Sequence, residues 1–111
     1  MAYDEDLANR IRELLAGEAD LTERKMFGGL AYLLGGHMAL AAGGEGGIMV
    51  RVDPAAAADL SRGAGVRFME MGGRQLRGWL RIEADGLRTK RQLARWVALG
   101  TAYVRSLPPK S

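Results

Sequence analysis

The residues with the clearest chemical potential are six arginines in the C-terminal half: Arg74, Arg77, Arg81, Arg88, Arg91 and Arg95. The last three are spaced by three and four, which places them on one face of a helix. Two of the others flank Trp79 on one side of a strand. A guanidinium binds phosphate or carboxylate through paired hydrogen bonds, and an aromatic ring between arginines can stack on a base. The pattern defines a candidate basic patch.

The same arginines can also be ordinary solvated side chains that pair with acidic neighbours. Glu70, Glu83 and Asp85 lie among them in the sequence. A nucleic-acid module usually brings a recognisable motif, and the sequence has no RNA-recognition signature, zinc knuckle or evident reading helix. Local pairing is therefore the favoured interpretation, and nucleic-acid binding is the alternative.

Nucleophilic and metal chemistry have little support in the sequence. His37 is the single histidine and there is no cysteine, whereas a metal site or a histidine base needs further ligands or a carboxylate partner. Ser61 and Ser106 do not stand in a nucleophile elbow. We therefore predict no catalytic residue, no metal site and no cofactor, and a protein that is not an enzyme.

A glycine-rich segment and a set of methionines both have structural explanations. The segment from Gly43 to Gly47 is followed by an apolar run, whereas a phosphate loop needs a helix directly after it, so we predict a hairpin turn. Methionine fills irregular gaps in cores, and a soft binding surface is the alternative. We predict packing between sheet and helix for Met26, Met38, Met49, Met69 and Met71.

Hydrophobic periodicity predicts a helix near each end of the chain. The first, over 4–16, carries one apolar stripe of leucine and isoleucine from Leu7 to Leu15. The last opens with the capping box Thr89 and Gln92 and ends before a pair of prolines. Its predicted core stripe consists of Leu93, Trp96, Val97, Gly100 and Val104.

Short apolar runs separated by glycine pairs predict an antiparallel sheet between these helices. A short helix over 55–60, started by Asp53 and Pro54, interrupts the runs. The sequence thus predicts an α+β fold, with about five strands flanked by N- and C-terminal helices that cover one face of the sheet. The runs are 25–27, 30–34, 37–42, 48–52, 66–71 and 78–83.

Two of these runs, 30–34 and 37–42, are apolar on both sides of the strand. A strand of this kind is expected to be buried on both faces, and two main helices cover only one. We therefore expect self-association into a homodimer. If instead the short helix covers the second face, then Ala31, Ala39 and Ala41 should be buried inside one subunit.

Composition indicates one domain in a reducing compartment. The sequence has 111 residues, no cysteine and no apolar run that approaches the length of a membrane span, so we expect a cytoplasmic protein without membrane contact. Residues 1–60 carry 5 basic and 10 acidic side chains, and residues 61–111 carry 11 basic and 3 acidic. The halves therefore have opposite net charge.

Two motifs carry a resemblance to a known family. They are Lys25-Met26-Phe27-Gly28-Gly29-Leu30-Ala31-Tyr32 and Met71-Gly72-Gly73-Arg74-Gln75-Leu76-Arg77-Gly78-Trp79. A polar helix precedes them, and a tryptophan-containing helix that ends in Ser106-Leu107-Pro108-Pro109 follows. In these features the chain resembles the N-terminal domain of the TfoX/Sxy regulators of natural competence, over nearly all of its length.

The resemblance implies a sheet between helices, similar to secretion-chaperone-like folds, and no catalytic residues. It also implies that Phe27 and Trp79 anchor the core. Full-length bacterial regulators of this family have a second, helical domain, and we expect residues 1–111 to form a single N-terminal-type domain without it.

The expected function is a non-enzymatic interaction module that acts in transcriptional regulation through an unknown protein partner. A direct nucleic-acid binder that uses the arginine-rich half is the alternative. Whether the six arginines converge on one exposed face or scatter into ion pairs distinguishes the two.

Overall fold

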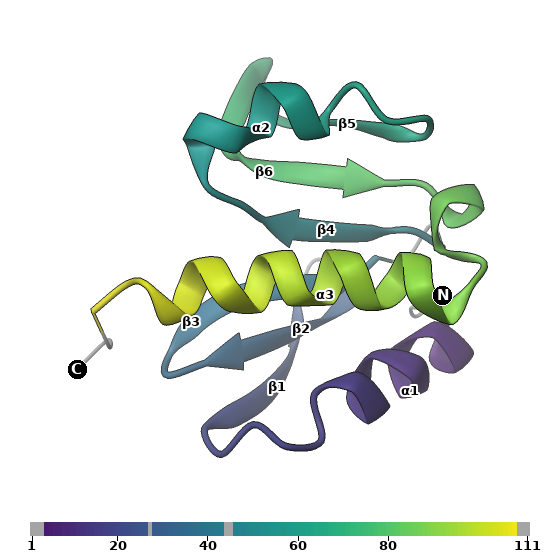
Figure 1. Cartoon of the computed structure of the whole chain (residues 1–111), viewed down its shortest axis with the longest axis vertical. Coiled ribbons are helices and arrows are strands. Elements are labelled where there is room, and N and C mark those ends of the chain that lie inside the picture. The colour runs from purple at the N-terminus through teal and green to yellow at the C-terminus, as the bar shows by residue number, and fades with distance from the viewer. Residues whose placement is uncertain (1–3, 27, 44–45, 109–111) are drawn as a thin grey trace.

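In the computed structural model, which describes residues 4–26, 28–43 and 46–108, three α-helices lie on one face of a six-stranded antiparallel sheet (Figure 1). The strand order is β1-β2-β3-β4-β6-β5. The predicted α+β class with flanking helices is confirmed, with six strands where about five were expected. In chain order the elements are α1 Glu5–Leu14, β1 Leu21–Met26, β2 Gly29–Leu34, β3 His37–Ala42, β4 Ile48–Arg51, α2 Pro54–Leu60, β5 Val66–Met71, β6 Arg74–Ile82, the 3-10 turn η1 Ala84–Leu87 and α3 Lys90–Arg105.

The helices begin where their capping residues predict. The Asp4 carboxylate accepts a hydrogen bond from the Leu7 backbone N–H at 3.2 Å, and Asp53 caps α2. The predicted capping box of α3 is present, with both hydrogen bonds between Thr89 and Gln92 at 3.0 Å. All five residues of the predicted α3 stripe are buried. Within the described residues, no helix is both long and apolar enough to cross a membrane.

Two strands begin earlier than predicted. β1 starts at Leu21 rather than residue 25, and β6 starts at Arg74 rather than residue 78. The added residues are mostly polar and exposed, because β1 is an edge strand and the start of β6 belongs to an exposed hairpin. Gly72 and Gly73 form the two-residue turn of that hairpin with φ of 61° and 81°, which suits a type I′ turn.

The main core lies between the helices and the covered face of the sheet. Tyr32 of β2 is fully buried there, and its hydroxyl donates a hydrogen bond of 2.8 Å to the Ala8 carbonyl of α1. Figure 1 shows α3 across the middle of the sheet with α1 and α2 on either side. Residues of all three helices, including Ala57 of α2, belong to this one cluster.

The other face of the sheet, which we call the open face, is not covered by a helix in the described part of the chain. The short helix α2 packs against β6 on the covered face, so it does not cover the open one. Even so, Ala31 and Ala41 are buried within the single chain, under a cluster of half-buried methionines. Ala39 is buried as well, but in the main core, next to an irregularity in the pairing of β2 and β3.

The methionine prediction is therefore wrong in its location. Three of the methionines pack on the open face rather than between sheet and helix. Met69 is half-buried, and Met71 is 56% exposed. The alternation of the strands places β-strand side chains on both faces, and sequence alone did not show which face the helices would take.

Ion pairs join α3 to the loop after α1, and join α1 to β1. Arg105 of α3 pairs with Glu18 and, at 3.0 Å, with Asp20, and its hydrogen bond lowers the pKa of the Asp20 carboxyl. Arg12 pairs with Glu23 of β1 at 2.6 Å and lowers the pKa of that carboxyl in the same way. A lowered carboxyl pKa adds stability at neutral pH that is lost as the pH falls through it.

Replacing Gly100 with a larger residue should weaken the packing of α3 against the sheet. A Cβ at this position would lie 2.9 Å from the Ala39 carbonyl oxygen and 3.0 Å from Val50 Cγ1, and a strand backbone cannot easily move away. We expect Gly100→Val to lower the free energy of unfolding by about 1–3 kcal/mol, measured by urea denaturation. Ala98→Val, at an exposed position of α3, is the control for the β-branched side chain. Equal effects of the two substitutions would contradict the close packing.

Candidate interaction surface

The six predicted arginines do not form one patch. Arg81 of β6 lies opposite Met49 and Arg67, which places it on the open face. Arg77 lies further along β6, and Arg74 lies next to the hairpin turn. Arg88, Arg91 and Arg95 belong to the start of α3 and the residues before it, on the covered side of the sheet. The sheet thus separates two groups of arginines.

Some of the six take part in local ion pairs, as the favoured interpretation expected. Arg88 pairs with Asp85 at 2.9 Å, and Arg81 Nε lies 3.4 Å from a Glu83 oxygen. Arg67, which the sequence did not single out, lies 3.3 Å from the same oxygen. Arg95 lies over the neighbouring Trp96 ring at 5.1 Å.

A row of side chains crosses all six strands on the open face. Residues directly opposite one another in antiparallel strands share a face, so the pairing register defines the row. It has an arginine at one end, two arginines at the other and small or flexible apolar side chains between them. From β1 to β5 it reads Arg24, Ala31, Ala41, Met49, Arg81 and Arg67.

The centre of the open face is apolar, and methionine side chains of the same face cover its small residues. Ala31, Leu33 and Ala41 are at most 9% exposed, and three half-buried methionines pack against them. These are Met26 of β1, Met38 of β3 and Met49 of β4. Methionine is flexible and polarizable, so such a surface can adapt its shape to a partner.

Arg51 and Trp79 lie next to each other at one end of the sheet, where the Arg51 side chain also reaches α3. They are paired in the register of β4 and β6, and the Arg51 guanidinium lies 6.0 Å from the Trp79 ring and 5.6 Å from the Tyr103 ring. Trp79 is half-buried and does not belong to the core cluster, which corrects its predicted role as a core anchor. Phe27, the other predicted anchor, lies outside the described residues.

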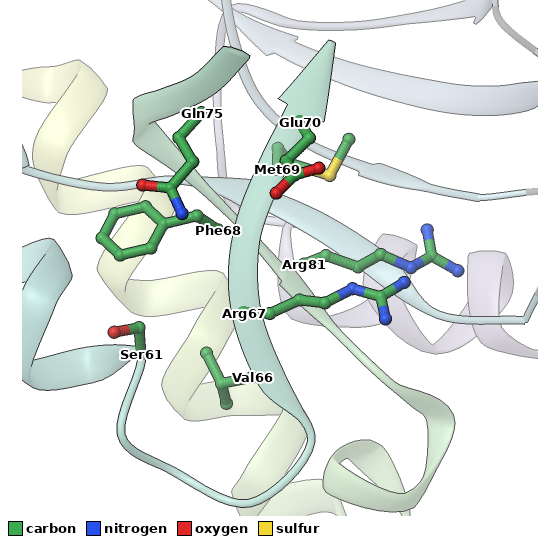
Figure 2. A pocket seen from close by; sticks show the side chains of 8 residues that line it. All are labelled: Ser61, Val66, Arg67, Phe68, Met69, Glu70, Gln75 and Arg81. Carbon is green, nitrogen blue, oxygen red and sulfur yellow. The ribbon is translucent and has the colours of Figure 1, made fainter. Parts of the chain in front are cut away.

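A hollow at the free edge of the sheet does not form a chemical site. Eight residues from Ser61 to Arg81 line it. Figure 2 shows that they belong to opposite sides of β5: Arg67 and Arg81 extend on one side, whereas Phe68 and Gln75 lie on the other. The two arginines therefore belong to the open face. The hollow is the space beside the edge strand β5 and has lining residues on both sides of that strand.

The residues considered for catalysis have structural partners. His37 begins β3, as predicted. Its Nε2 donates a hydrogen bond of 2.6 Å to the Pro108 carbonyl oxygen, and this contact was not predicted because the two residues are far apart in the sequence. Ser61 and Ser106 each donate a hydrogen bond to a backbone carbonyl at a helix end. No group of three or more potential metal ligands occurs among the described residues. The glycine-rich segment joins β3 to β4 as predicted; its Gly44 and Glu45 lie outside the described residues.

The comparisons with known proteins place the chain by family. The model of the TfoX N-terminal domain matches residues 13–103, which span the whole sheet, α2 and nearly all of α3. No curated protein and no solved structure matches the chain.

The separation of the arginines predicts weak binding to DNA. On labelled duplex DNA at physiological salt we expect nonspecific binding only, with a Kd of roughly 1–100 µM that weakens with a log–log salt slope of about −0.9 per phosphate contacted. The triple variant Arg88→Ala, Arg91→Ala, Arg95→Ala should change this little, because the open face keeps its arginines. Submicromolar binding that the triple variant abolishes, with an unchanged circular dichroism spectrum, would instead favour the nucleic-acid function.

Proposed function

This chain belongs to the TfoX N-terminal domain family, and we propose that it is a non-enzymatic interaction module that contributes to transcriptional regulation through a protein partner. The observation that carries the proposal is the open face of the sheet. It combines a flexible apolar centre with arginines on both sides, and no helix covers it within the described residues. Exposed surfaces of this composition are typical of protein contacts.

Direct nucleic-acid binding is the second candidate, because Arg51 and Trp79 lie together at one end of the sheet. An aromatic ring beside a guanidinium can support base stacking. However, Trp79 is half-buried and already in contact with Arg51. The centre of the open face is alanine, leucine and methionine, which provide no flat stacking surface. We therefore place protein contact first.

We further propose that the module is a homodimer, joined at the free edge of β5. The sheet ends in β1 and β5. β1 carries Thr22 to Lys25, a polar and charged run that protects an edge strand from pairing. β5 instead leads to Met71, the one exposed large hydrophobic side chain among the described residues. Two copies can pair their β5 strands and extend the sheet while leaving both open faces accessible.

A charge at Met71 should weaken the dimer. We expect the wild-type protein to sediment as a dimer at micromolar concentration, and Met71→Glu to raise the dissociation constant at least about tenfold, because pairing would bury an unpaired carboxylate. Thr22→Glu on the opposite edge is the matched control and should have no effect. A wild-type protein that sediments as a monomer throughout this concentration range would contradict the homodimer.

The regulatory role can be tested in cells that carry the gene. We expect deletion to change the abundance of a defined set of transcripts, and the chromosomal double variant Arg24→Gln, Arg67→Gln to reproduce that change. The control variant Arg91→Gln, Arg95→Gln removes the same charge from the covered side and should behave as wild type. Unchanged transcripts after deletion would contradict a role in transcription.

A further inference from the structure

We infer that the chain binds a small organic acid with an apolar body in a cleft on the covered side of the sheet. The cleft lies between the end of α2, the loop that leads to β5, and the first turns of α3, and its volume is about 570 Å³. Clefts that bind small molecules have volumes of roughly 300–1,000 Å³. We call it the α2–α3 cleft. The inference goes beyond the proposed interaction function, which uses the opposite face of the sheet.

The floor of the α2–α3 cleft is the border of the main core. Val66 of β5 and Ile82 of β6 are directly opposite each other, so both lie on the covered face. Leu60, the last residue of α2, and Trp96 of α3 complete the floor. Leu60 and Val66 are only half-buried, so they leave apolar surface in contact with water. Covering this surface favours a ligand with an apolar body.

Small residues keep the α2–α3 cleft open. Gly63 and Ala64, in the loop after α2, and Gly86, in η1, line its walls and have no side chain large enough to fill the space. The helix α2 is only seven residues long and packs on β6. The chain therefore leaves the space beside the start of α3 unfilled.

Two arginines that line the same cleft have no ion pair among the described residues. Arg91 and Arg95 are exposed and lie one turn apart on α3, where they face the cleft. The acidic residue of the lining, Asp59, already has a cationic partner, because its carboxylate lies 3.6 Å from the Arg62 guanidinium. Two positive charges thus remain for a ligand beside an apolar floor.

The arrangement of these arginines suits a carboxylate. The Arg95 guanidinium lies over the Trp96 ring, 5.1 Å from its centroid. A stacked guanidinium keeps its N–H groups in its own plane, where they can donate paired hydrogen bonds to a carboxylate. The first turn of α3 has no acidic residue, so the positive end of the helix also favours an anion. A carboxylate held here leaves the rest of the ligand over the apolar floor.

Other classes of small molecule satisfy only part of the α2–α3 cleft. Acetate or inorganic phosphate would leave the apolar floor in water, whereas a neutral apolar molecule would give the two guanidinium groups no counter-charge. A cationic ligand would be repelled by both arginines. The cleft therefore favours molecules that combine a carboxylate with an apolar body.

The test uses the isotope-labelled full chain and α-naphthaleneacetate, with binding followed by NMR chemical shifts. We expect saturable shifts of the Gly63 and Gly86 amides and of the Trp96 indole N–H. The Kd should be about 1 mM or lower, as is usual for a ligand of this size. The neutral analogue α-naphthaleneacetamide should bind more weakly, and acetate should cause no saturable shift.

Three variants separate the charged part of the site from its apolar part. Arg91→Gln with Arg95→Gln should raise the Kd for the acid roughly tenfold, but should leave the Kd for the amide nearly unchanged. Val66→Thr should weaken the acid and the amide by a similar factor, because it removes apolar surface from the floor. The matched control, Arg74→Gln with Arg77→Gln, removes the same charge from the exposed hairpin and should bind as wild type.

Several outcomes would overturn the inference. They are the absence of saturable shifts up to about 10 mM ligand, shifts centred on the open face, or an amide or inorganic phosphate that binds as tightly as the acid. Tighter binding of a short peptide with a C-terminal phenylalanine would show that the cleft recognises a protein end instead. The variant Arg91→Gln, Arg95→Gln should lose the acid and leave transcripts unchanged, so the failure of this inference and that of the proposed function can be told apart.

Discussion

The close contact between α3 and the sheet at Gly100 is the constraint on which the packing of the core depends. With no side chain at this position, the helix approaches the backbone of β3 and the side chain of Val50 more closely than a Cβ would permit. Trp96, Val97 and Val104 then reach the same face as Tyr32 and its hydrogen bond to α1. All the helices among the described residues lie on this side of the sheet, which leaves the other face open.

An apolar sheet face without a covering helix risks aggregation, and the structure limits this risk in two ways. Methionine side chains lie over the small residues, so that Ala31 and Ala41 are buried without a partner. Arginines at both ends of the row repel another copy of the same face. The methionines and the arginines of this face together limit contact between free chains.

Features that depend on residues close together in the sequence were predicted. Contacts that depend on the pairing register of the strands were not. The capping box of α3 and its core stripe are local features, and both were predicted. The candidate arginines were chosen for closeness in the sequence, whereas Arg24 and Arg67 join Arg81 only through strand pairing across the sheet. The contact between His37 and Pro108 is non-local in the same sense.

The second family motif shapes this surface through the backbone. Near the hairpin turn Met69 pairs with Leu76, but the next residue of β5, Phe68, pairs with Leu80, so Arg77, Gly78 and Trp79 have no partner in β5. Gly78 and Trp79 instead continue the pairing with the end of β4. β6 thus has three more residues than β5 between these two pairs. An odd number of extra residues shifts the side-chain alternation of β6 relative to that of β5 at this point. The motif thereby sets the register in which Arg67 faces Arg81, and its role is to position the arginines of the open face.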